Sequence, residues 1–189
     1  LSYTMVTGKL AVSPQTVTSM AAQGILRVES YETYRNPVHF DELPGEKKKL
    51  TEVQQEIADD FIRSYDAGDR TPVLLHGITG SGKTEVYMEM IDAMLQRGKQ
   101  CIVLIPEIAL TYQTLLRFYK RFGDAVSVMH SRLSAGERYD QMKRAKRGEV
   151  QVMIGPRSAL FTPFQKLGLI IIDEEHETSY KSDSMPKYH

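Results

Sequence analysis

The feature that most constrains the fold of this chain is a glycine-rich stretch of eight residues, Gly77-Ile78-Thr79-Gly80-Ser81-Gly82-Lys83-Thr84. It has the pattern G-x-x-x-x-G-K-[ST], in which backbone N–H groups surround a phosphate. The apolar run at residues 73–75 predicts a buried strand before it, and the apolar spacing over residues 82–97 predicts an amphipathic helix after it. Free N–H groups and the positive end of a helix dipole then point at one anion. We therefore predict a nucleotide site.

Two residues of this stretch have defined roles in such a site. Lys83 would reach the β- and γ-phosphates of ATP, and the hydroxyl of Thr84 would hold Mg²⁺. The glycines allow a close backbone approach that a Cβ would forbid. The alternative is a glycine-rich turn that binds nothing, and the strand–loop–helix context favours the nucleotide site over it.

Bulk composition limits the remaining possibilities. The chain has 189 residues, 41% of them hydrophobic, and a formal net charge of +0, so any contact with nucleic acid must be local. Its single cysteine, Cys101, excludes an intramolecular disulfide, and its apolar neighbours predict a buried side chain. No apolar run reaches the ~20 residues of a membrane helix and no signal peptide is visible, which predicts a cytoplasmic protein without membrane contact. Because the chain begins at Leu1, we expect it to be part of a larger protein.

Residues 1–36 differ in character from the rest and predict a small separate module. Ser13 followed by Pro14 predicts a helix start, and Gly24 suits the end of that helix. Residues 25–35 have the rough alternation of a strand pair. A helix and two strands are typical of the end of a winged helix-turn-helix, although the pattern also occurs in other folds and the helix lacks the basic residues of a DNA-reading helix.

Residues 37–49 contain two prolines, a glycine and a run of lysines, and they predict a linker. Residues 50–189 then alternate between strand and helix patterns, and the strands are nearly all apolar, as in a parallel sheet covered on both faces. The predicted strands are 73–75, 100–105, 126–129, 150–154 and 169–172, and the predicted helices are 51–65, 82–97, 108–122 and 134–147. We predict an α/β domain with a parallel sheet, helices on both faces, and its ligand at the carboxyl ends of the strands.

A second group of functional residues, Asp173-Glu174-Glu175-His176, follows the last predicted strand. Asp173 would complete the Mg²⁺ shell, and Glu174 would orient and deprotonate the attacking water. His176 is placed to link the γ-phosphate region to another surface through a hydrogen bond. The alternative is an ordinary acidic turn, but D-E-x-H paired with a phosphate loop favours a helicase or translocase over a small-molecule kinase or a GTPase.

Five segments occurring in one order resemble the first RecA-like lobe of the primosomal protein N′ family, the bacterial replication-restart DNA helicases of superfamily two. They are the glycine-rich stretch with Glu85-Val86-Tyr87, then Pro106-Glu107-Ile108-Ala109-Leu110-Thr111-Tyr112-Gln113, His130-Ser131, Arg157-Ser158-Ala159-Leu160-Phe161-Thr162-Pro163-Phe164, and Asp173-Glu174-Glu175-His176. The resemblance implies a P-loop NTPase fold over residues 50–189, truncated after the DExH motif. A partial winged-helix module over residues 1–36 agrees with the domain order of the family.

The resemblance also implies a function. A protein of this family is an ATP-dependent DNA helicase that unwinds stalled or collapsed forks and initiates primosome assembly. It uses ATP and Mg²⁺, and zinc is expected only in a cysteine-rich part absent from these residues. The implied partners are single-stranded and forked DNA, single-stranded DNA-binding protein and helicase-loading proteins. Because such a motor takes an arginine finger from a second lobe, we expect weak ATP binding and slow turnover from these residues alone.

Two alternative functions stay open. The first is another superfamily-two translocase that moves on duplex DNA without separating its strands. The second is a module that only binds DNA or a protein partner. Strand separation on forked DNA distinguishes the first from a helicase, and DNA binding after deletion of residues 1–45 tests the second.

The resemblance assigns DNA contacts to six residues: Pro106, Thr111, His130, Ser131, Arg157 and Ser158. Thr111 has an equal claim as a helix cap, and Arg157 as an ordinary surface residue. Pro156 departs from the family pattern, in which a smaller or hydroxylated residue is expected at this position. Its missing N–H argues against a backbone contact with phosphate there.

Gln54 has two alternative roles that exclude each other at its side chain. With Thr51 it forms a capping box that opens a helix. In many helicases a glutamine just ahead of the ATP loop instead reads the edge of the adenine. We therefore place Gln54 among the candidate nucleotide-binding residues.

Overall fold

The computed structural model describes residues 2–29 and 49–181, and the chain divides into two compact units, Leu1–Thr33 and Tyr34–His189. In the first unit, α1 (Pro14–Ala22) begins at Ser13, whose side chain accepts a hydrogen bond from the backbone N–H of Thr16. Gly24 follows the helix with a left-handed φ of 71°. The predicted start and end of this helix are confirmed, and a short π-helix, Met5–Lys9, precedes it.

The strand predicted to follow α1 is wrong over residues 25–29, which form no regular element. A strand needs a hydrogen-bonded neighbour and a face to bury, and here Ile25 and Val28 are exposed. Its predicted partner at residues 30–35 and the linker up to residue 48 lie outside the described residues. The winged-helix identity of the module therefore stays a prediction.

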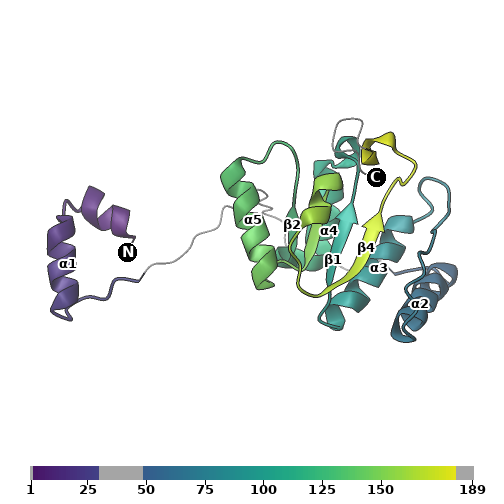
Figure 1. Ribbon diagram of the computed structural model, residues 1–189, viewed down its shortest axis with the longest axis horizontal. Helices are drawn as coiled ribbons and strands as arrows, with labels where there is room; N and C mark the ends of the chain where they lie inside the picture. Colours follow the sequence, from purple (N-terminus) through teal and green to yellow (C-terminus); the bar gives the residue numbers. More distant parts are fainter. Residues whose placement is uncertain (1, 30–48, 182–189) are drawn as a thin grey trace. The chain divides into compact units, whose positions relative to one another are not determined.

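The second unit is built on a four-stranded parallel sheet in the order β2-β3-β1-β4 (Figure 1). The central strand β1 (Gln100–Leu104) pairs with β3 (Val152–Gly155) on one side and with β4 (Leu167–Ile172) on the other, and β2 (Val126–Val128) pairs with β3. All five side chains of β1 are buried, because helices cover both faces of the sheet. The predicted α/β fold with a parallel sheet is confirmed.

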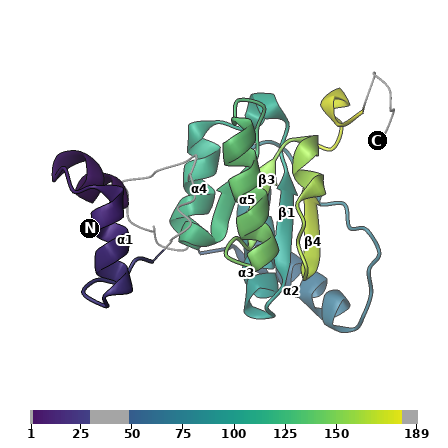
Figure 2. The same cartoon turned by 60° about the vertical axis from the view of Figure 1, so that its left-hand side comes forward.

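The helices form two layers, one on each face of the sheet (Figure 2). Because side chains alternate along a strand, Cys101 and Val103 of β1 pack in one core with α2 (Glu52–Asp66), α3 (Lys83–Gln96) and α4 (Tyr112–Phe122). The intervening Ile102 and Leu104 pack in a second core with α5 (Ala135–Arg147). Helices therefore cover the central strand β1 on both faces.

The helix starts follow their local sequence. Capping boxes open α2 at Thr51 and α5 at Ser134, as predicted. The predicted helix 108–122 instead begins at Tyr112, and Glu107–Ala109 forms a separate 3-10 helix. The reason is Thr111, whose extended backbone (ψ 162°) interrupts the helical path and whose side chain caps α4.

The predicted strand at residues 73–75 is also wrong. Val73 and Leu74 are 63% and 72% exposed and belong to no strand, and only Leu75 packs against the core. A strand exists through its ladder of hydrogen bonds, and this run pairs with no neighbour among the described residues. Among the described residues, the outer edge of β4 also has no pairing strand. The side chains of Ile170 and Ile172 on β4 are 42% and 52% exposed.

The predicted burial of Cys101 is confirmed, and it generates a test of the core. The side chain is fully buried, and this burial raises the pKa of the thiol to about 12. Since the thiolate is the reactive form, we expect Cys101 to resist iodoacetamide in the folded protein and to react after unfolding in guanidinium. Mass spectrometry measures the alkylation without ambiguity, because the chain has one cysteine. Rapid alkylation under native conditions would contradict this packing.

Candidate functional site

The glycine-rich stretch forms a tight loop that leads into α3. Gly80 and Gly82 have left-handed φ values of 82° and 86°, which favour glycine. A Cβ placed on Gly77 would lie 2.8 Å from the Oγ of Ser81, so the loop also closes on itself without room for a side chain. Ile78 at its tip is exposed. The loop therefore has the shape that lets backbone groups approach a phosphate closely.

Lys83 brings a positive charge to this loop at the first residue of α3. Its Nζ donates hydrogen bonds to the carbonyl oxygens of Gly77 and Ile78, at 2.6 and 3.1 Å. The positive end of the helix dipole lies at the same place. A phosphate, being an anion, would compete well with neutral carbonyls for this ammonium group.

Gln54 ties α2 to the same loop. Its Oε1 accepts a hydrogen bond from the N–H of Thr51 at 3.0 Å, which completes the capping box. Its Nε2 meanwhile donates to the carbonyl of Ser81 at 2.9 Å, and a Cβ on Gly82 would collide with this amide. The capping role is confirmed, and the second bond was not expected from the sequence. The contact with adenine stays a prediction.

Asp173 lies at the carboxyl end of β4 and is fixed there through its backbone. Its N–H donates to the carbonyl of Leu104 at 2.9 Å. The hydroxyl of the buried Tyr180 donates to two carbonyl oxygens, that of Leu104 at 3.0 Å and that of Asp173 at 2.6 Å. The ends of β1 and β4 are therefore held together where the segment Asp173–His176, here called the DEEH residues, begins. Glu174 then turns the chain away with a positive φ of 50°.

Tyr87 connects the loop and Asp173, and the sequence had not singled it out for this. It lies on α3 three residues after Thr84, and its hydroxyl donates to Oδ2 of Asp173 at 3.0 Å. Burial and then the negative charge of Asp173 raise the pKa of Tyr87 well above its usual range, so the phenol stays a donor. The side chain of Thr84 acts in the opposite direction and lowers the pKa. The available signal was its i,i+3 spacing from Thr84, which places both on one helix face.

The remaining acidic residues of the motif lie in solvent. Nε2 of His176 is 3.7 Å from Oε2 of Glu174, and its Nδ1 is 3.4 Å from Oε2 of Glu175. The structure thus brings His176 and Glu174 together. Both stay accessible to water, as a residue that orients an attacking water must be.

Five of the six predicted DNA contacts lie around one cavity of about 350 Å³ at the carboxyl edge of the sheet. These five are Pro106, His130, Ser131, Arg157 and Ser158. Thr111 does not line the cavity, and its hydroxyl accepts a hydrogen bond from the N–H of Thr114 at 3.2 Å. The capping role of Thr111 is confirmed, and its contact with DNA stays a prediction. Arg138 and Tyr180 also line the cavity.

Glu107 is a residue of this cavity that sequence reasoning missed. Its carboxylate accepts hydrogen bonds from the backbone N–H of Ser131 at 3.1 Å and from the Ser131 hydroxyl. These bonds lower the pKa of Glu107, so it stays ionised. No sequence signal pairs residues 107 and 131, because the contact arises only when the ends of β1 and β2 reach one edge of the sheet.

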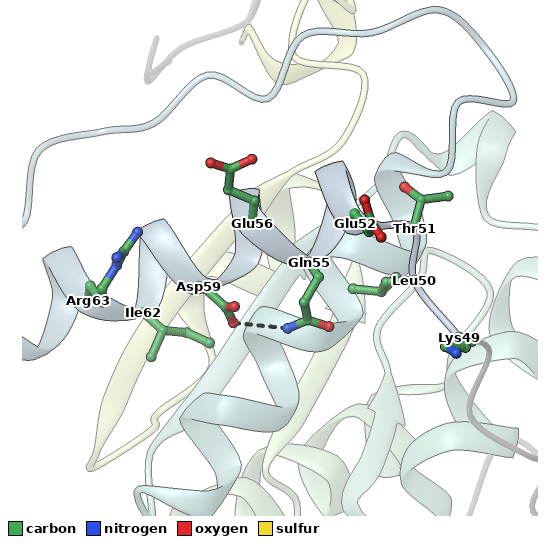
Figure 3. A pocket seen from close by; sticks show the side chains of 9 residues that line it. All are labelled: Lys49, Leu50, Thr51, Glu52, Gln55, Glu56, Asp59, Ile62 and Arg63. Carbon is green, nitrogen blue, oxygen red and sulfur yellow. Dashed lines mark hydrogen bonds between the residues drawn. The ribbon is translucent and has the colours of Figure 1, made fainter.

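A larger hollow of about 1110 Å³ runs along α2 (Figure 3). Its charged side chains include three carboxylates, those of Glu52, Glu56 and Asp59, and two cationic groups, Lys49 and Arg63. An excess of carboxylates repels phosphate. The predicted nucleotide residues contribute none of its lining, so this hollow is separate from the phosphate loop.

The oxygen ligands of the site suit magnesium. Mg²⁺ is usually held by one or two carboxylates or hydroxyls together with phosphate and water, and Asp173 and Thr84 supply such groups beside one phenol. Over residues 2–29 and 49–181, no group of three or more His, Cys, Asp or Glu is placed to hold a metal ion. In the same ranges no helix has the length and apolar character to cross a membrane.

Comparisons with known proteins agree with this geometry. Residues 47–188 match the family model described as Type III restriction enzyme, res subunit. The chain is 45% identical over 183 residues to the replication restart protein PriA of Bacillus subtilis, and 41% identical over 180 residues to that of Synechocystis sp.. A third PriA, from Haemophilus influenzae, is 51% identical over 116 residues. The resemblance to replication-restart helicases is thus confirmed.

The first two alignments cover 96% and 94% of this chain but 23% and 21% of the relatives, and the third covers 61% and 16%. The chain therefore spans about a quarter or less of the length of these relatives. The family model, in contrast, covers most of the chain, including the phosphate loop, the sheet and the DEEH residues. This chain belongs to the family of the type III restriction enzyme res subunit, with a RecA-like P-loop fold, and is similar to replication restart proteins PriA.

Proposed function

We propose that this chain is the ATP-binding half of an ATP-dependent DNA helicase that acts in replication restart. The observation that carries the proposal is the hydrogen bond from Tyr87 to Asp173, which joins the phosphate loop and the DEEH residues into one site. The similar proteins are named replication restart proteins, and these names support replication restart as the process in which the helicase acts. The second lobe that such a motor needs would come from outside these residues.

The residues of the loop and of the DEEH segment have separate roles in this proposal. Residues 77–84 bind the triphosphate of ATP, with Lys83 on the β- and γ-phosphates. Thr84 and Asp173 hold Mg²⁺, which neutralises charge on the phosphates when it is bound. Glu174 orients and deprotonates the attacking water, and His176 keeps the position of Glu174 through their contact.

The cavity that Arg157 and His130 line is the proposed place for the DNA backbone. It lies at the same edge of the sheet as Asp173, and Tyr180 contributes to both. A phosphate bound there would lie beside the ends of the strands that carry the ATP site. Such a neighbourhood supports a motor in which DNA contacts and ATP hydrolysis influence each other.

The remaining proposals concern the whole protein. We infer a partial winged-helix module at residues 1–36, a linker at residues 37–49, and the first helicase lobe from residue 50 onward. The substrates are single-stranded and forked DNA in the cytoplasm, and the partners are single-stranded DNA-binding protein and helicase-loading proteins. Zinc belongs to a cysteine-rich part outside these residues.

A translocase that does not separate strands is the second candidate, because the matching family is described by a restriction enzyme subunit. Strand separation on a labelled fork with ATP, measured on the full-length protein, distinguishes the two. Release of a labelled strand supports the helicase. ATP consumption without release, combined with displacement of a protein block from duplex DNA, supports the translocase.

Replacing Lys83 with alanine tests the nucleotide site. Loss of a charged hydrogen bond to phosphate costs about 1.5–3 kcal/mol, so we expect the Kd for a fluorescent ATP analogue to rise about 10- to 100-fold. Fluorescence titration in the presence of Mg²⁺ measures the change. Lys146→Ala, at an exposed position of α5, is the matched control and should leave the Kd unchanged. Equal affinities of the Lys83→Ala protein and the wild type would refute the proposed site.

Replacing Glu174 with glutamine separates binding from hydrolysis. The amide cannot accept the proton of the attacking water, so we expect hydrolysis to fall by about 10²- to 10⁴-fold with nucleotide affinity unchanged. Release of labelled phosphate in a single turnover measures the rate of hydrolysis. The substitution is made in the full-length protein and measured with DNA, where the wild-type rate is high enough for the loss to be seen. Glu175→Gln, one residue along, should retain most of the activity. A fully active Glu174→Gln protein would remove Glu174 from the proposed role.

Replacing Arg157 with alanine tests the cavity as a DNA site. If the guanidinium contacts a phosphate, its loss should weaken binding of any sequence and reduce the slope of log K against log salt by about 1. Fluorescence anisotropy of a labelled oligonucleotide over a salt series provides both quantities. Arg63→Ala on α2 removes the same charge at a distance from the cavity and should change neither. An unchanged slope for Arg157→Ala would exclude this contact.

A further inference from the structure

The hydroxyl of Tyr87 donates to one of the two side chains that we propose as magnesium ligands. Its 3.0 Å hydrogen bond to Oδ2 of Asp173 spans 86 positions in the sequence and links α3 to the end of β4. Tyr87 lies on the same helix as Thr84, the other proposed ligand, three residues after it. The phenol therefore ties the helix that carries one proposed ligand to the other proposed ligand, in the DEEH segment.

The ring of Tyr87 is fixed in the core, so its hydroxyl has little freedom. Tyr87 is only 5% exposed, and its ring stacks on that of Phe118 with centroids 6.1 Å apart and an interplanar angle of 22°. Phe118 belongs to α4 and is itself fully buried. A donor held this rigidly fixes whatever accepts from it.

The carboxylate of Asp173 keeps room for a metal or its water. Tyr87 donates to Oδ2, and the backbone N–H of Glu174 donates to Oδ1 at 3.1 Å. A carboxylate has about four lone-pair sites, so two stay open after these two bonds. The two donors define the orientation of the carboxylate without using up its capacity as a ligand.

We propose that Tyr87 is a positioning residue that holds Asp173 in place for magnesium, a role that rests on the proposed nucleotide function. Its hydroxyl acts through the carboxylate of Asp173. Partners of metal ligands commonly change metal affinity by about 10- to 100-fold when they are lost. The competing explanation is that the bond only fastens α3 to β4.

The test is Tyr87→Phe, which removes one oxygen and keeps the stacked ring. Affinity for a fluorescent ADP analogue is measured without Mg²⁺ and then over a Mg²⁺ titration. We expect unchanged affinity without Mg²⁺, and a Mg²⁺ concentration for half-saturation about tenfold higher than in the wild type. Binding of Mn²⁺ in the presence of ADP, followed by electron paramagnetic resonance, gives the same comparison without any turnover.

Tyr65→Phe is the matched control. Tyr65 lies on α2, packs partly against the same core and has the guanidinium of Arg70 at 3.9 Å from its ring centroid. The substitution removes the same atom away from the proposed ligands, and it should leave the Mg²⁺ dependence unchanged. A second comparison uses Asp173→Ala, in which the acceptor is absent. There Tyr87→Phe should have no further effect on Mg²⁺ dependence, even if it lowers the unfolding temperature.

The outcomes separate this inference from the function on which it rests. If the wild type binds the nucleotide with no dependence on Mg²⁺, the proposed function fails. If the wild type depends on Mg²⁺ and Tyr87→Phe shows the same half-saturation, the inference fails and the function stands. A loss of affinity in Tyr87→Phe that is equal with and without Mg²⁺ shows a structural tie only, and it overturns the inference as well.

Discussion

The parallel pairing of β1 with both of its neighbours is the constraint on which the rest of this unit depends. The five side chains of β1 are all buried, and its backbone is hydrogen-bonded to β3 on one side and to β4 on the other. Because the three strands run in one direction, the segments that follow them emerge at one edge of the sheet. Pro106, Arg157 and Asp173 therefore come together although long stretches of sequence separate them. Both candidate sites exist only because this edge exists.

The sequence predicts most of this fold because burial on both faces leaves a local trace. Strands covered by helices on each side lose polar alternation and become continuous apolar runs, as at Cys101-Ile102-Val103-Leu104. Residues 73–75 have the same composition and yet form no strand, because a strand also requires a neighbour with a free edge in the right place. Pairing is a property of the whole chain, and a run of three residues does not contain it. Helix starts were predicted better, since Thr51 and Ser134 bond to residues only three positions away.

In the candidate site, too, local features were predicted from the sequence and distant contacts were not. Spacing alone identified the glycine-rich loop and the DEEH segment, because each is a continuous motif. Tyr87 and Glu107 escaped, since their partners lie 86 and 24 positions away. Gln54 shows a third case, in which one predicted role, the helix cap, is confirmed and a distant contact is added to it. Its oxygen caps α2 while its nitrogen bonds to the loop at Ser81.

Two contacts from different sites meet at Asp173. Tyr180, from the side of the cavity, fixes its carbonyl, and Tyr87, from the side of the phosphate loop, fixes its carboxylate. The two bonds restrain different atoms of one residue, so each can be removed while the other remains. A contact chain of this kind shows proximity, and coupling additionally requires an element with two arrangements that both sites bias. The turn at Glu174 follows directly, and its positive φ is costly for a residue with a Cβ and persists only while its surroundings hold it. The strand end that carries the acidic ligand is thus held by a tyrosine from each site and is followed by a residue in a strained backbone conformation.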